Sequence, residues 1–234
     1  MPTWTVVGAL VKTVRVTSEQ PEPVQRPGVG SPRRLEALSD GAFAIVLTII
    51  VIEIHVPAGP PSELVHQLGE LVPTLLAYGL VFMSMGVIWF GNRTQTEFLE
   101  RADHPYVWLN LLMLMLVAFV PFTAEFLARY PTTHVAVGIF GAHMFAIEAV
   151  HGAIWVYLTA RPDLMRPGVT AEYRRRSRFP GVAPALAYAV ATVVGLLWPV
   201  AGLVCYVLIP LAFISGLYYR WLGSLAGGTA DQED

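Results

Sequence analysis

Long apolar runs separated by short polar segments set the pattern of this chain. A helix needs about 20 mostly apolar residues to cross a bilayer. Four runs reach that length: residues 37–56, 71–90, 106–126 and 135–159. A fifth run, 182–219, would be about 57 Å long as one helix, nearly twice the hydrocarbon thickness. Because proline disfavours helix in the residue before it, we expect a turn at Trp198-Pro199, with helices over 182–197 and 200–219.

The pattern therefore predicts an all-α fold, an integral membrane six-helix bundle with one six-span unit per chain and no internal repeat. Pro121 is expected to kink the third span. Residues 17–31 are rich in proline, glycine and polar side chains, and the apolar run at 4–11 is too short to span a membrane, so residues 1–32 are expected to be a disordered or poorly ordered segment. Residues 33–222 are then the membrane unit, and 223–234 a soluble acidic tail.

The positive charges predict an orientation, because lysine and arginine favour cytoplasmic loops. With six spans, all but Arg129 of the 15 Lys and Arg residues fall on one side of the membrane. Five spans would put Arg220 on the opposite side. We therefore expect a multi-pass protein of the cell membrane with both termini in the cytoplasm.

Composition narrows the function classes. The chain is 55% hydrophobic and 14% charged, whereas roughly a quarter of the residues of a soluble domain are charged. A net charge of −2 gives no reason to expect a nucleic-acid partner, and the arginine run at 174–178 suits a loop near anionic lipid headgroups. The lone Cys205 excludes an intrachain disulfide and a thiolate metal cluster. Nucleotide-binding glycine loops and hydrolase motifs are absent, so neither an enzyme nor a cofactor is predicted.

Two carboxylates interrupt the first span, and such groups are costly in a membrane and are usually functional. Glu53, near the outer end, either reaches the headgroups or belongs to a ring of carboxylates at a pore mouth. Asp40 lies near the inner end, where a buried polar network with Ser39 and groups of spans two and three is expected. The candidates at that depth are Trp89, Asn92, Arg93, His104, Trp108 and Asn110.

A second polar pair lies in the fourth span, where Glu148 precedes His151 by three residues. This spacing is half of a di-iron carboxylate motif, but no second such pair occurs in a span, so no metal site is predicted. A hydrogen-bonded pair that holds helices together is one alternative. The other is a proton or ion relay of a secondary transporter that uses Glu148, His151 and Glu53.

The start of the first span carries a family resemblance. The segment from Arg34 to Asp40, followed by an apolar run, resembles the signature Arg-x-x-x-Phe-Ser-Asp of the transmembrane protein 175 family of potassium channels. The segment Trp89-Phe-Gly-Asn92-Arg93 resembles the Trp-x-x-His-His segment that ends span two of the family. Two departures stand out, since a leucine replaces the signature phenylalanine and Asn92-Arg93 replaces the usual histidine pair.

Span three continues the resemblance through Trp108-Leu-Asn110 and the later Phe-Val-Pro-Phe-Thr, so that it is good over 34–129 and weak beyond. It implies that Arg34, Ser39 and Asp40 are structural. They would anchor the inner half of span one, with Trp89, Asn92, Trp108 and Asn110 among the groups of that network.

The same resemblance implies a pore lined by the first span. Ile45, Ile49 and Ile52 would form its hydrophobic constriction, and Thr48 would add a hydroxyl ring that favours potassium. At about 100° per residue, the three isoleucines fall within roughly 60° of one another, although a lipid-facing or packing stripe would show the same spacing. The animal relatives carry two copies of the unit, so a single copy implies a homotetramer. The implied function is a potassium-preferring cation channel in the lipid bilayer, with a gate that can close by dewetting.

Overall fold

The structure is a computed structural model that describes residues 32–216, and within this range it contains helices and no β-strand. The α-helices are α1 (Arg33–Ile49), α2 (Leu64–Glu70), α3 (Val72–Glu97), α4 (His104–Ala118), α5 (Val120–Arg129), α6 (His134–Ala160), α7 (Ala171–Arg176), α8 (Arg178–Leu197) and α9 (Pro199–Ile214). Three 3₁₀ turns are η1 (Ile50–Glu53), η2 (Pro61–Glu63) and η3 (Pro162–Leu164). The predicted disordered N-terminal segment, the acidic tail and the end of span six lie outside the described residues, apart from Pro32.

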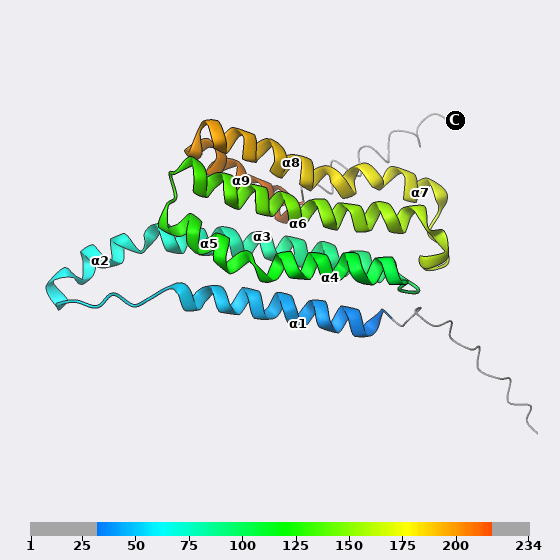
Figure 1. Ribbon diagram of the computed structural model, residues 1–234, viewed down its shortest axis with the longest axis horizontal. Helices are drawn as coiled ribbons and strands as arrows, with labels where there is room; N and C mark the ends of the chain where they lie inside the picture. The colour runs from blue at the N-terminus through cyan, green and yellow to red at the C-terminus, as the bar shows by residue number, and fades with distance from the viewer. Residues whose placement is uncertain (1–31, 217–234) are drawn as a thin grey trace, which may run out of the picture.

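The long helices run side by side along one axis (Figure 1), with α1 at one edge of the bundle and α8 at the opposite edge. Helix α6 is the most buried of them, and it packs on α8, α4 and α5. Helix α1 packs mainly on α4 and α3, with a smaller contact on α5. The chain therefore has a well-packed interior around α6, and its first helix lies at the periphery with few neighbours.

Five stretches are long and apolar enough to cross a membrane, and the sixth, α9, is apolar but only 16 residues long as described. This confirms the predicted six-helix membrane architecture. The second span differs in its inner end, because α3 continues to Glu97 rather than stopping at Phe90. Hydropathy falls after Phe90, but residues 91–97 contain no proline, so the helix continues for about two further turns that are mostly polar.

The helix is interrupted next to the kink predicted at Pro121: α4 and α5 are separated by the single residue Phe119, whose backbone stays in the helical region. His143 of α6 joins the two halves: its Nε2–H donates to the Leu116 carbonyl at 3.0 Å, and its Nδ1 lies 2.9 Å from the Thr123 hydroxyl. The Leu116 carbonyl also accepts from the Phe119 amide at 3.0 Å, so the histidine adds a second hydrogen bond at the interruption and ties α6 to both halves of the span.

The predicted turn at Trp198-Pro199 is confirmed, since Trp198 is extended between α8 and α9. The two helices meet closely at glycines: a Cβ atom on Gly202 would lie 2.3 Å from the Gly195 Cα atom. Small residues at such a crossing let two backbones approach. Tyr206 of α9 then reaches α6, where its hydroxyl donates to the Val137 carbonyl at 3.0 Å.

Candidate functional site

Helix α1 has one side inside the bundle and one side outside it. Ser39, Phe43, Val46 and Ile50 are buried and recur every three to four residues, which is the spacing of a single helix face. They pack toward α3 and α4. This side fixes how the helix is turned.

A second face, about 110° around the helix from the buried one, carries the three isoleucines that the family resemblance assigned to a constriction. Ile45 is 58% exposed, Ile49 41% and Ile52 68%. The last turn is a 3₁₀ turn, which advances about 120° per residue and so brings Ile52 within about 20° of Ile49. The stripe is therefore about 40° wide, narrower than an ideal α-helix would make it. All three side chains are exposed in the single chain, Ile49 the least of them.

Thr48 lies beside this stripe and is exposed. Its Oγ1 is 2.9 Å from the Ala44 carbonyl oxygen and 3.0 Å from that of Ile45, so the hydroxyl proton is donated to its own helix. The oxygen lone pairs stay available as acceptors. Glu53 ends η1, but its side chain lies outside what the structure describes, so its place at a pore mouth stays a prediction.

Five polar side chains near the inner end of α1 form what we call the inner cluster: Ser39, Asp40, Trp89, Asn92 and Asn110. The Ser39 hydroxyl lies 3.1 Å from Asn110 Oδ1, and Asn110 Nδ2 donates to Asn92 Oδ1 at 3.3 Å. Trp89 Nε1 donates to Asp40 Oδ1 at 2.8 Å. The inner cluster thus joins α1, α3 and α4, and its serine and two asparagines are buried.

Two residues expected in this network lie apart from it. Trp108 is 60% exposed, and its indole donates to His104 Nε2 within its own helix at 2.8 Å. Arg34 is exposed in the first turn of α1, and no described hydrogen bond or ion pair links it to the inner cluster. Arg93, another candidate, pairs with Glu97 at 3.2 Å.

Comparison with known proteins supports the resemblance seen in α1 and the inner cluster. The family model described as endosomal/lysosomal potassium channel TMEM175 matches residues 34–121. A potassium channel of Streptomyces collinus is 36% identical over 160 residues, which cover 66% of this chain and 78% of that protein. A potassium channel of Chamaesiphon minutus is 36% identical over 148 residues, covering 61% of this chain and 73% of that protein. The chain belongs to the TMEM175 family.

A solved structure supports the fold. The crystal structure of a lysosomal potassium-selective channel TMEM175 homolog from Chamaesiphon minutus superposes with a TM-score of 0.70 at 29% identity. The match covers 78% of this chain and 96% of that one. The bundle described above is therefore a TMEM175 fold along most of its length.

The Glu148–His151 pair lies in α6, outside the stretch that the TMEM175 family model matches. His151 Nδ1 is 3.4 Å from Glu148 Oε2, and both residues are buried. Gln95 of α3 donates from Nε2 to the His151 carbonyl at 3.0 Å. Gly91 makes room for the ring, because a Cβ atom there would lie 2.6 Å from His151 Cε1. The hydrogen bond of the pair lies within α6, whereas the bond between α3 and α6 is made by the Gln95 side chain to the His151 main chain. That the pair itself holds helices together stays a prediction.

Sequence reasoning missed Gln95, because the second span was predicted to end at Phe90. One signal was present: Gly91 and Gln95 are four residues apart and so share a helix face. Within the described residues, no three His, Cys, Asp or Glu side chains lie close enough together to hold a metal ion. Nothing in this part of the TMEM175 chain therefore supports the di-iron interpretation of the pair.

Proposed function

We propose that this protein is a potassium channel whose pore is lined by α1. The observation that carries the proposal is the narrow stripe of Ile45, Ile49 and Ile52, exposed on a helix whose other side is anchored in the bundle. Membership of the TMEM175 family supports it, as do the two bacterial relatives, which are named potassium channels.

The pore is proposed to form between four identical chains around one axis. Each chain supplies one such helix, so several copies are needed to enclose a path, and a closed cyclic assembly is the usual arrangement. The stripe of α1, apolar and exposed in a single chain, would then face the axis. A monomer would leave it facing lipid.

Conduction through a ring of isoleucines rests on partial dehydration. A hydrocarbon ring offers no replacement for the water around an ion, and potassium loses water more cheaply than sodium, so modest potassium preference follows. The acceptor lone pairs of Thr48 offset part of the lost hydration. When the ring narrows, it expels water and closes the path. Glu53 at the outer mouth would concentrate cations.

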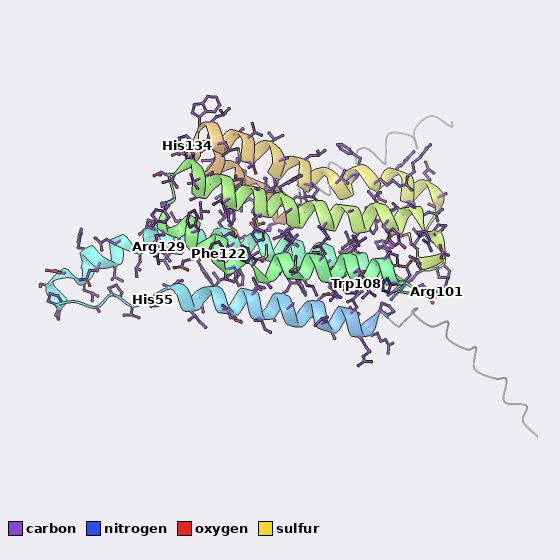
Figure 2. The ribbon with its side chains drawn as sticks, in the orientation of Figure 1. His55, Arg101, Trp108, Phe122, Arg129 and His134 are labelled. Atoms are coloured by element: carbon purple, nitrogen blue, oxygen red, sulfur yellow. The ribbon has the colours of Figure 1, made fainter. Side chains whose placement is uncertain are left out.

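The inner cluster would hold the inner half of α1 in register, so that the four isoleucines of each ring stay at one depth. Arg101 lies at one end of the bundle and Arg129 at the other (Figure 2). Since positive charge favours the cytoplasmic side, the Arg101 end is the proposed cytoplasmic end. The proposed location is the cell membrane, with both termini in the cytoplasm.

The Ile45→Asn variant tests the constriction. A polar amide in the ring wets the narrow part, so we expect faster potassium flux and a loss of preference over sodium. The measurement is ion flux into liposomes that contain the purified protein, driven by a potassium gradient and read by a fluorescent reporter. Val190→Asn, on the exposed side of α8, is the matched control and should leave flux and preference unchanged.

The buried Glu148–His151 pair favours one rival, a transporter that moves ions through titratable groups. The same flux assay separates the two functions. If Ile45→Asn leaves flux and ion preference unchanged while Glu148→Gln abolishes flux, the channel proposal fails and the transporter is supported.

A further inference from the structure

A cavity of about 170 Å³ lies between α3, α6, α8 and α9. Its walls include Val87 and Gln95 of α3, Glu148, His151 and Trp155 of α6, and Phe213 of α9. No residue of α1 lines it, so it is separate from the stripe proposed to form the pore. We call it the inner cavity.

Two buried polar atoms at the inner cavity have no hydrogen-bond partner: Gln95 Oε1 and His151 Nε2. Gln95 is 5% exposed and His151 9%. The amide of Gln95 cannot turn its oxygen away, because its Nε2 is held by the His151 carbonyl, which only a donor can satisfy. Buried polar atoms are almost always paired, so both atoms point to a missing partner.

The walls present acceptors and a negative charge. When His151 Nδ1–H donates to the Glu148 carboxylate, Nε2 of the same neutral ring is an acceptor. The carboxylate of Glu148 and Oε1 of Gln95 are acceptors as well. Two donors of the wall are already used, since Trp155 Nε1 donates to the Ser177 carbonyl and the Thr94 hydroxyl to the Phe90 carbonyl. No lysine or arginine is among the described lining residues. Tyr173 also lines the inner cavity, but a partner that brings N–H donors and a positive charge would satisfy all three acceptors at once.

The rest of the wall is apolar and aromatic, with Val87, Ile88, Trp155, Pro184 and Phe213. Such a wall suits the body of an organic cation better than a hydrated metal ion, and aromatic faces attract cations. A dry cavity of about 150 Å³ holds a benzene ring, so a ligand of about eight non-hydrogen atoms fits.

We propose that the inner cavity binds a small organic ammonium ion. Its ammonium group is held by Glu148, Gln95 and His151, and its apolar body lies against Trp155 and Phe213. This site is independent of ion conduction, so its test does not depend on the proposed function.

The test uses the full chain, purified in detergent, and benzylammonium chloride as the probe. A ligand that binds only the folded state raises the unfolding temperature in a saturable way. We expect this rise with benzylammonium, and we expect Glu148→Gln to weaken the apparent affinity about tenfold or more, because a charged hydrogen bond is lost. Gly91→Ala should also weaken it, since the added Cβ pushes the His151 ring into the space the ligand needs.

The control variant is Glu125→Gln, which removes an acid of α5 that pairs with Arg129 at 2.7 Å and does not line the inner cavity. It should bind the probe as the wild type does. Benzyl alcohol, a neutral probe of the same shape, and potassium chloride at the same ionic strength should not raise the unfolding temperature. An equal rise with either, or an affinity unchanged in both folded variants, Glu148→Gln and Gly91→Ala, overturns the proposal.

Discussion

Asn110 shows what a single polar residue does inside this membrane bundle. Its side chain links Ser39 of α1 to Asn92 of α3, and all three side chains are buried. The Ser39 hydroxyl also lies 2.9 Å from the Leu35 carbonyl of its own helix, so its contact with Asn110 is what ties it to a neighbouring helix. The first helix, which packs on few neighbours, therefore owes part of its placement to one amide.

The Asn110→Leu variant should destabilise the protein by about 1–3 kcal/mol, because it leaves the buried Ser39 and Asn92 without their shared partner. The measurement is equilibrium or thermal unfolding in detergent. Trp108→Phe is the control, since that indole is exposed and bonded only within its own helix, and it should change stability by no more than about 0.5 kcal/mol. Equal effects of the two variants would contradict the role given to the inner cluster.

The position of a residue along its helix could be predicted from the sequence, but the side of the helix on which it lies was harder to predict. The residues of the inner cluster lie at one depth because the ends of the apolar runs define it. Trp108 lies at that depth too, yet it is two residues from Asn110, which is about 200° around the helix. If Asn110 faces the bundle, Trp108 must face away. Arg34 is about 140° from Ser39 by the same reasoning. The alternation was present in the sequence, but which residue faces inward depends on tertiary packing.

At the scale of helices, two prolines marked interruptions correctly, whereas Pro184 and Pro210 lie inside α8 and α9 without ending them. The interruption next to Pro121 and the turn at Pro199 follow from local chemistry, the missing N–H and the fixed backbone angle. The inner end of α3 was missed, because hydropathy reports where the membrane ends and not where the helix ends. Close contact between α8 and α9 was also not predictable, since many glycines occur in the chain and only some lie at a crossing.

Gly202→Ala tests that crossing. Its Cβ would meet the backbone of Gly195 rather than a movable side chain, so α8 and α9 must separate, and we expect a loss of about 1–3 kcal/mol. Unfolding in detergent measures it. Gly79→Ala in α3 is the matched control, because nothing lies within 4 Å of its added Cβ, and it should keep or raise stability. A neutral Gly202→Ala would show that the contact between the two helices is loose.

At the scale of the whole molecule, the number of chains is the point that one sequence leaves open. The proposed tetramer predicts that residue 45 of one chain lies near residue 45 of its neighbours. In a Cys205→Ser background, Ile45→Cys should form disulfide-linked dimers under mild oxidation in liposomes, seen on a non-reducing gel. Val190→Cys, on the opposite edge of the bundle, should not. Efficient linking of Val190→Cys alone would place the subunit contact on α8.

The inner ends of the helices are tied by the main chain. The Glu100 and Arg101 amides donate to the Leu164 carbonyl, and the Arg166 amide donates to the Phe98 carbonyl. These bonds use no side-chain atom, so Arg166 can be exchanged, and with it part of the surface charge presented to lipid, without losing them. The Arg101 guanidinium, in contrast, donates to the Asp163 carbonyl at 2.7 Å and belongs to the tie between the two loops. The loop side chains that face lipid headgroups can therefore change with the membrane, while the main-chain hydrogen bonds between the two loops stay the same.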